Sequence, residues 1–259
     1  MRWHKQTVTS GSVQLAVRDS GGDGTTAVLL HGLGAPQRSW DRVAPLLARH
    51  LRVVTYDQRG HGASAAAVDY SLDAFLADLQ AVLDALALER PLLVGHSFGG
   101  LLAVEYAAAH PGCTGVVGVD GGLKIERPPI GWGEVQAQLD RPLTRLLSRV
   151  VTAMGLGSRL SFAELRRVAD EAAGREARLD ETYLRLTCPM LLVVAGKADP
   201  VPHGEAMLAA VDTAANRLQQ RHPEVKLARP PCGHAIPLER PRELADLIIG
   251  FAESSAAQL

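Results

Sequence analysis

The chain contains the three residue types that a serine-based nucleophilic site requires. Ser97 lies at the centre of residues 95–99, which read Gly-His-Ser-Phe-Gly, and candidate aspartates and a candidate histidine, His234, follow it along the chain. A serine hydroxyl is a weak nucleophile at neutral pH. It therefore needs a base within hydrogen-bond reach and an acid that orients that base. These residues predict a nucleophilic site at Ser97, with a histidine as base and an aspartate as acid.

Ser97 is predicted to lie on a sharp turn between a buried strand and a helix. Residues 92–94 form a short apolar run that is typical of a buried parallel strand, and residues 101–110 have helical character. Gly95 and Gly99 flank the serine where a β-carbon would collide with the neighbouring strand or helix. This pattern is typical of a nucleophile elbow, in which the serine is held in strained backbone.

The acid and the base are expected at the same edge of the sheet as Ser97. Asp199 follows the predicted strand 190–195, and His234 lies in a loop between the last predicted strand and the last helix. Sites in open α/β sheets lie beyond the carboxyl ends of the strands, so both side chains fall on that rim. Asp120 also ends a strand at this edge and is the alternative acid. The positions relative to the strand ends favour Asp199.

Acyl transfer also needs hydrogen-bond donors that point at the developing oxyanion. The backbone N–H of Phe98, directly after the nucleophile, can supply one donor. The second is expected from Leu33, in the Gly-rich loop that begins at His31, because Gly32 lets the chain bend so that the next amide points inward. His31, Gly32 and Trp132 are predicted to contact the substrate.

Strands and helices alternate along the chain, which predicts a mostly parallel sheet covered by helices on both faces. Ser71 suits the N-cap of the most strongly amphipathic predicted helix. The predicted strands are residues 6–10 and 13–18, which form a hairpin, and residues 27–30, 52–56, 92–94, 114–119, 190–195 and 225–228. The predicted helices outside the interruption described next are residues 40–49, 71–86, 101–110 and 242–252.

This alternation stops between residues 121 and 185, where no strand is predicted. Helical runs are predicted at 143–154 and 161–173, and Ser161 with Glu164 forms a capping box for the second run. About 65 residues are too many for one crossover connection, which favours an inserted helical cap over ordinary sheet-covering helices. The predicted division is a core of residues 1–120 and 186–259 and a cap of residues 121–185.

Composition restricts the classes of partner. The 259 residues suffice for one large α/β domain, and the net charge of −1 with no dense Lys/Arg cluster argues against a nucleic-acid partner. No uncharged apolar stretch reaches the roughly 18 residues of a membrane span. The first residues lack the apolar region of a signal peptide, so a cytoplasmic location is expected. The three cysteines show no zinc-ligand spacing, and no metal site is predicted.

Together these motifs resemble the α/β-hydrolase superfamily along nearly the whole chain, and its small, capped serine esterases in particular. Residues 57–64 add the D-x-R-G-x-G-x-S loop that is common after the fourth strand in such members. The resemblance implies an α/β-hydrolase fold with a mostly parallel, eight-stranded sheet flanked by helices and an inserted cap. It also implies a triad of Ser97, Asp199 and His234, with Asp57 and Arg59 as structural residues.

The function that the resemblance implies is hydrolysis of a carboxylic ester, lactone or thioester of a small acyl substrate. Serine at position 97 argues against the dehalogenases and epoxide hydrolases of this superfamily, which use a carboxylate nucleophile. A C–C bond hydrolase, or a non-hydrolytic lyase or cofactor-free oxygenase, stays open as the alternative. We expect no metal or organic cofactor, no membrane or nucleic-acid partner, and a monomer or homodimer.

Overall fold

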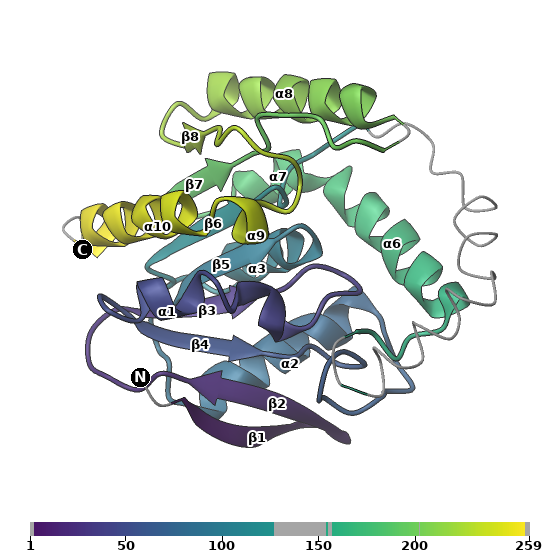
Figure 1. The fold of residues 1–259 in the computed structure, drawn as a ribbon, viewed down its shortest axis with the longest axis vertical. Coiled ribbons are helices and arrows are strands. Elements are labelled where there is room, and N and C mark those ends of the chain that lie inside the picture. The colour runs from purple at the N-terminus through teal and green to yellow at the C-terminus, as the bar shows by residue number, and fades with distance from the viewer. Residues whose placement is uncertain (1–2, 127–153, 155–156, 202, 257–259) are drawn as a thin grey trace.

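An eight-stranded sheet forms the centre of the fold (Figure 1). The computed structural model describes residues 3–126, 154, 157–201 and 203–256. The strands lie in the order β1-β2-β4-β3-β5-β6-β7-β8, and their bounds are β1 His4–Ser10, β2 Val13–Asp19, β3 Thr26–Leu30, β4 Arg52–Tyr56, β5 Leu92–His96, β6 Gly115–Val119, β7 Met190–Val193 and β8 Lys226–Ala228.

Among the described strands, only β2 runs opposite to the others. β1 pairs with β2 and β2 with β4 in antiparallel register, whereas β4, β3, β5, β6, β7 and β8 are parallel neighbours. In β3, Val28 and Leu30 join the hydrophobic cluster on one face, and Ala27 and Leu29 join the cluster on the other. The strand is therefore buried on both sides, which is why it reads as a continuous apolar run.

Helices cover both faces of the sheet. Helices α1 and α10 pack together on one face, and α2 and α3 pack on the other (Figure 1). The described helices are the 3₁₀ helix η1 Gln37–Trp40, α1 Ala44–Leu47, α2 Leu72–Ala85, α3 Phe98–Ala109, α6 Phe162–Glu176, α7 Leu179–Tyr183, α8 Gly204–Arg221, α9 Ile236–Glu239 and α10 Pro241–Ala256.

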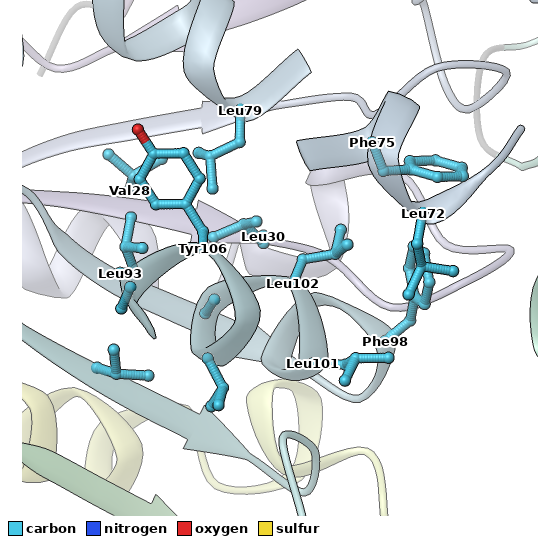
Figure 2. Close-up of a cluster of buried hydrophobic side chains, with 14 of the residues drawn as sticks. Val28, Leu30, Leu72, Phe75, Leu79, Leu93, Phe98, Leu101, Leu102 and Tyr106 are labelled. Carbon is cyan, nitrogen blue, oxygen red and sulfur yellow. The ribbon is translucent and has the colours of Figure 1, made fainter. Parts of the chain in front are cut away.

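The core between α2, α3 and the sheet fixes the start of the helix that follows Ser97. Figure 2 shows Phe75 of α2 above Phe98 of α3, in the hydrophobic cluster that the two helices share. The Phe75 and Phe98 rings meet edge to face with centroids 5.1 Å apart, a preferred aromatic geometry. Because Phe98 is the first residue of α3 and only 6% exposed, its packing also fixes the position of its own backbone.

The fold class and the sheet are as the sequence predicts, and the differences concern helices. Ser71 caps α2 by accepting a hydrogen bond from the Ala74 amide, and Ser161 caps α6 through a capping box with Glu164, as predicted. The predicted helix 40–49 is instead η1 and the four-residue α1. Helix α8 has no counterpart in the prediction, although its buried residues recur at helical spacing.

Along the chain, helices α6 and α7 come after β6 and before β7, within the range of the predicted cap. Nearly all of the predicted run 143–154 and the predicted contact residue Trp132 lie outside the described residues. No helix in the described ranges is both long and apolar enough to cross a bilayer.

Candidate active site

Ser97 lies on the predicted sharp turn between β5 and α3. Its backbone has φ 52° and ψ −118°, a conformation that costs free energy for a residue with a side chain. The Ser97 amide donates to the Val119 carbonyl at 2.9 Å, which ties the turn to the end of β6. A β-carbon on Gly95 would meet the Gly99 carbonyl, and one on Gly99 would meet the Leu30 carbonyl. The two glycines thus permit the close backbone packing that holds the strained turn.

The ring of His234 is hydrogen-bonded to Asp120. His234 Nδ1 and Asp120 Oδ2 are 2.6 Å apart, and the Asp120 side chain is 7% exposed. The second carboxylate oxygen of Asp120 accepts from the Ala195 amide at 3.0 Å. Burial raises the pKa of Asp120, but the hydrogen bond and charge of His234, together with the Ala195 hydrogen bond, lower it more, so the net shift is downward. Asp120 is therefore an ionised carboxylate that orients the imidazole.

Asp199, the acid that the sequence favours, contacts His234 differently. Both of its carboxylate oxygens lie 3.2 Å from the backbone N of His234 and accept from that amide. A β-carbon on Gly233 would meet the Asp199 carboxylate, so the carboxylate packs directly against the loop. The structure thus joins the imidazole to Asp120, while Asp199 holds the main chain that carries it.

The turn after β6 explains why Asp120 reaches the site. Asp120 has φ 45°, and Gly121 follows it. A β-carbon on Gly121 would meet the Ser97 carbonyl, so this turn packs main chain to main chain against the nucleophile elbow. The Asp-Gly-Gly sequence at 120–122 is the signal that could have favoured Asp120.

His96, next to Ser97, supports the His234 loop. Its Nε2 donates to the His234 carbonyl at 2.9 Å, and the two ring centroids are 4.8 Å apart. Burial, together with repulsion from His234, lowers the pKa of His96 to about 4. His96 is therefore neutral at physiological pH and does not add a charge beside the imidazole.

Two cavities meet at Ser97. The larger has a volume of about 260 Å³ and is also lined by Asp120 and His234. Its remaining wall is mostly apolar and comes from the segment after β7, from the first half of α8 and from Ile125, with Lys197, Asp199 and His203 as polar groups. The apolar members are Ile125, Ala195, Ala198, Val201, Met207, Leu208 and Val211. The smaller cavity measures about 100 Å³ and is lined by Ser97, Leu33, Phe98 and four α6 residues, Ala169, Ala172, Ala173 and Glu176.

The two predicted oxyanion donors lie together in the smaller cavity. Within the described residues, neither the Leu33 amide nor the Phe98 amide has a hydrogen-bond acceptor. Phe98 is the first residue of α3, where a helix leaves its amides without an intrahelical partner. A β-carbon on Gly32 would lie 3.4 Å from the Ser97 β-carbon, so the loop that carries Leu33 packs directly on Ser97. Two unpaired amides beside a serine can stabilise a negatively charged oxygen.

His31 does not contribute to either cavity, which differs from the prediction that it contacts substrate. Its side chain is fully buried, its Nδ1 donates to the Gly32 carbonyl at 2.9 Å, and its Nε2 accepts from the Gln58 amide at 2.9 Å. Both ring nitrogens are therefore used inside the protein. Gly32 also stays outside both cavity walls, although it contacts the elbow.

The loop of residues 57–64 is held by buried polar contacts. Asp57 accepts from the Gln37 amide at 2.6 Å and from the Ala63 amide at 3.0 Å. Arg59 forms two hydrogen bonds of 2.7 Å with Asp78, whose side chain is fully buried. Asp57 and Arg59 thus connect elements away from Ser97. In the described ranges no group of three or more His, Cys, Asp or Glu side chains is arranged to hold a metal ion.

Comparison with known proteins places this geometry in a family. The model of the alpha/beta hydrolase family matches residues 27–247, which include the elbow, both aspartates and His234. The chain belongs to the alpha/beta hydrolase family. This membership agrees with the sheet order and with the nucleophile elbow found here.

Three relatives illustrate the range of this alpha/beta hydrolase's neighbours. A 2-hydroxy-6-oxo-2,4-heptadienoate hydrolase from Pseudomonas putida is 37% identical over 114 residues, which are 40% of this chain and 39% of that relative's length. A 2-hydroxy-6-oxo-6-(2'-aminophenyl)hexa-2,4-dienoic acid hydrolase from Metapseudomonas resinovorans is 28% identical over 96% of this chain and 91% of its own. A solved structure from work on carboxylesterases of Nitrososphaera gargenis superposes with a TM-score of 0.79 at 18% identity, covering 98% of this chain and 100% of that one.

Proposed function

We propose that this protein is a serine hydrolase that cleaves a carboxylic ester, lactone or thioester through an acyl-enzyme. The observation that carries the proposal is the position of Ser97 between the His234–Asp120 pair, in the larger cavity, and the free amides of Leu33 and Phe98, in the smaller one. A nucleophile, an oriented base and two oxyanion donors are the parts that acyl transfer requires.

In the proposed first half-reaction, Ser97 Oγ attacks the substrate carbonyl carbon while His234 Nε2 takes the hydroxyl proton. The carbonyl oxygen becomes an oxyanion that accepts hydrogen bonds from the Leu33 and Phe98 amides. His234 then gives the proton to the leaving group, and the C–O or C–S bond breaks to leave an acyl-serine. Water, deprotonated by His234, then attacks the acyl carbon. The bond from that carbon to Ser97 Oγ breaks, His234 returns the proton to Oγ, and the acid is released.

Asp120 is the acid in this proposal, in place of Asp199. The 2.6 Å contact with His234 Nδ1 keeps the proton on Nδ1, which leaves Nε2 free to act as base. The same carboxylate stabilises the imidazolium that forms during each proton transfer. Asp199 is a positioning residue for the His234 backbone.

The two cavities differ in ways that suggest how a substrate lies. The smaller one contains the oxyanion donors and is narrowed by the alanines of α6, so it suits the smaller substituent of the carbonyl. The larger, mostly apolar one extends from Ser97 along α8 and suits the larger substituent. An apolar or weakly polar acyl compound of moderate size fits this division.

Hydrolysis of a C–C bond next to a ketone is the second candidate function. Both dienoate hydrolases described above carry the names of enzymes that act on 2-hydroxy-6-oxo-dienoates, and one of them aligns with nearly the whole chain. That chemistry could use the same Ser97, His234 and oxyanion amides, but with a carbon leaving group that His234 protonates. We prefer the ester hydrolase because a dienoate substrate carries a carboxylate that needs cationic partners. Few cationic side chains line the described cavities, and Lys197 is one of them.

The test is labelling with a fluorophosphonate combined with a panel of p-nitrophenyl esters, a thioester and a 2-hydroxy-6-oxo-dienoate. We expect stoichiometric labelling of Ser97, ester turnover, and loss of both in Ser97→Ala at unchanged thermal stability. Turnover of the dienoate with no turnover of the esters or the thioester would favour the C–C hydrolase function instead. An unlabelled wild-type protein with no turnover on the panel would exclude both proposals.

A further inference from the structure

The two peptide groups on either side of Leu33 are each held by a buried histidine. The Gly32 carbonyl accepts from His31 Nδ1 at 2.9 Å, and the Gly34 amide donates to His61 Nε2 at 3.0 Å. Both histidine side chains are fully buried, and their ring centroids are 5.1 Å apart. Nothing in the proposed reaction uses these rings directly, so their arrangement needs another explanation.

The hydrogen-bond partners fix the protonation state of His61. Its Nδ1 lies 2.8 Å from the Arg59 carbonyl, which can only accept, so Nδ1 carries the proton. Its Nε2 receives the Gly34 N–H and must therefore present a lone pair. Burial lowers the pKa of His61, which keeps the ring neutral and this acceptor available.

Because of peptide geometry, these two contacts together fix the direction of the Leu33 N–H. In a planar trans peptide the C=O and the N–H point in opposite directions. When His31 fixes the Gly32 carbonyl, it also fixes the Leu33 N–H of the same peptide, which points the other way. The Gly34 N–H belongs to the next peptide, Leu33–Gly34. When His61 fixes this N–H, it fixes the plane of that peptide and so restricts the remaining backbone rotation at Leu33.

We infer that His61 is a positioning residue for the oxyanion hole: it holds the Leu33–Gly34 peptide and so restricts rotation at Leu33, whose N–H would face the reacting carbonyl. This inference rests on the proposed serine hydrolase function. His61 contacts no substrate; it acts through one backbone hydrogen bond. Its own position is fixed by the Arg59 carbonyl and by packing against Phe75, whose ring centroid is 6.5 Å away.

Two polar substitutions separate the acceptor from the donor function of the ring. In His61→Gln the longer amide can place its Oε1 near the former Nε2 and still accept the Gly34 N–H. In His61→Asn the shorter amide can donate to the Arg59 carbonyl, in place of Nδ1, but cannot reach Gly34. Both variants bury an uncharged amide, so each serves as the stability control for the other.

The measurements are the rate of fluorophosphonate labelling of Ser97, kcat and KM for the best ester, and the inhibition constant of a trifluoromethyl ketone analogue of that ester. Removing one oxyanion donor lowers kcat by about 10²–10³-fold. A donor N–H that is present but poorly oriented is therefore expected to lower kcat by about 10–100-fold. We expect this loss in His61→Asn, with KM nearly unchanged and ketone binding weakened in parallel. His61→Gln should stay within about fivefold of the wild type, because an amide oxygen is an adequate acceptor.

The inference is overturned if the two variants lose activity equally, if the loss follows the unfolding temperature, or if KM rises while kcat stays constant. Each of these outcomes requires an active wild type and so leaves the proposed function standing. A wild type that the fluorophosphonate does not label would remove the proposed function, and this inference with it.

Discussion

Replacing Asp120 with asparagine tests the pairing with His234 most directly. The Asp120 carboxylate lies 2.6 Å from His234 Nδ1, which puts the charge centres of the ionised pair about 4 Å apart. At an effective dielectric constant of about 20 their attraction is about 4 kcal/mol. The ring is 46% exposed, and solvent screening reduces this to about 3 kcal/mol. Loss of that attraction alone corresponds to about a 10²-fold slower reaction.

The new amide also changes the tautomer of His234. The Ala195 amide, which donates to Asp120 at 3.0 Å, will keep the asparagine oxygen on its side. The NH₂ group then faces His234 Nδ1 and favours the tautomer with the proton on Nε2, which cannot accept the serine proton. Such exchanges in Ser-His-Asp triads reach about 10⁴-fold in kcat, so we expect about 10³-fold here.

Steady-state kinetics on the best p-nitrophenyl ester, with unfolding temperatures as a check, would measure this effect. The matched control is Asp199→Asn, whose amide oxygen can still accept from the His234 backbone, so its kcat should fall by less than about tenfold. If Asp199→Asn shows the large loss and Asp120→Asn the small one, the assignment of the acid from this geometry is wrong.

Three further predictions concern stability. Gly99→Ala should lower the free energy of unfolding by about 3 kcal/mol in a urea titration, because its methyl group would meet the last carbonyl of β3; a loss below 1 kcal/mol would contradict the close packing. Arg59→Met should cost about 3–5 kcal/mol in the same assay, since it leaves the fully buried Asp78 without its partner, and an unchanged midpoint would refute this. Burial raises the pKa of Asp19, but the hydrogen bonds from Arg52 and the Gly21 amide, together with the charge of Arg52, lower that pKa below the usual 3.8. The difference in the free energy of unfolding between wild type and Arg52→Gln should therefore have its full value near pH 6 and shrink toward pH 2. A difference that does not depend on pH would exclude this role of the ionised Asp19.

The features that the sequence predicts well are those fixed by local chemistry. The elbow at Ser97 needs glycines at fixed offsets and a strand before it, and all of these are visible in residues 91–100. The capping box at Ser161 is equally local and is present in the structure. Helix α8 was missed because most of its surface is polar. Its buried side chains are those of Val211, Ala214, Ala215 and Leu218, and Gly204 at its start is also buried.

The choice between the two aspartates could not be made from the strand ends. Val119 pairs with Val193 in the parallel register of β6 and β7, so Asp120 and Asp199 emerge from neighbouring strands at the same edge. Which of them meets the imidazole depends on the path of the loop before His234, and that path is set by long-range contacts. His31 posed a similar difficulty, because its motif places it near Ser97 but does not say which way its ring points.

The main-chain packing around Ser97 has a consequence for engineering and for evolution. Gly99 rests against the Leu30 carbonyl and Gly121 against the Ser97 carbonyl, so Ser97 is located by backbone atoms. The cavities beside Ser97, which would hold a substrate in the proposed function, are lined in part by side chains of α6 and α8. Libraries that randomise Ala172 and Met207 should therefore yield many members that still react with a fluorophosphonate while differing in the acyl chains they accept. Substrate range and catalytic competence are, in this protein, properties that mutation can change independently.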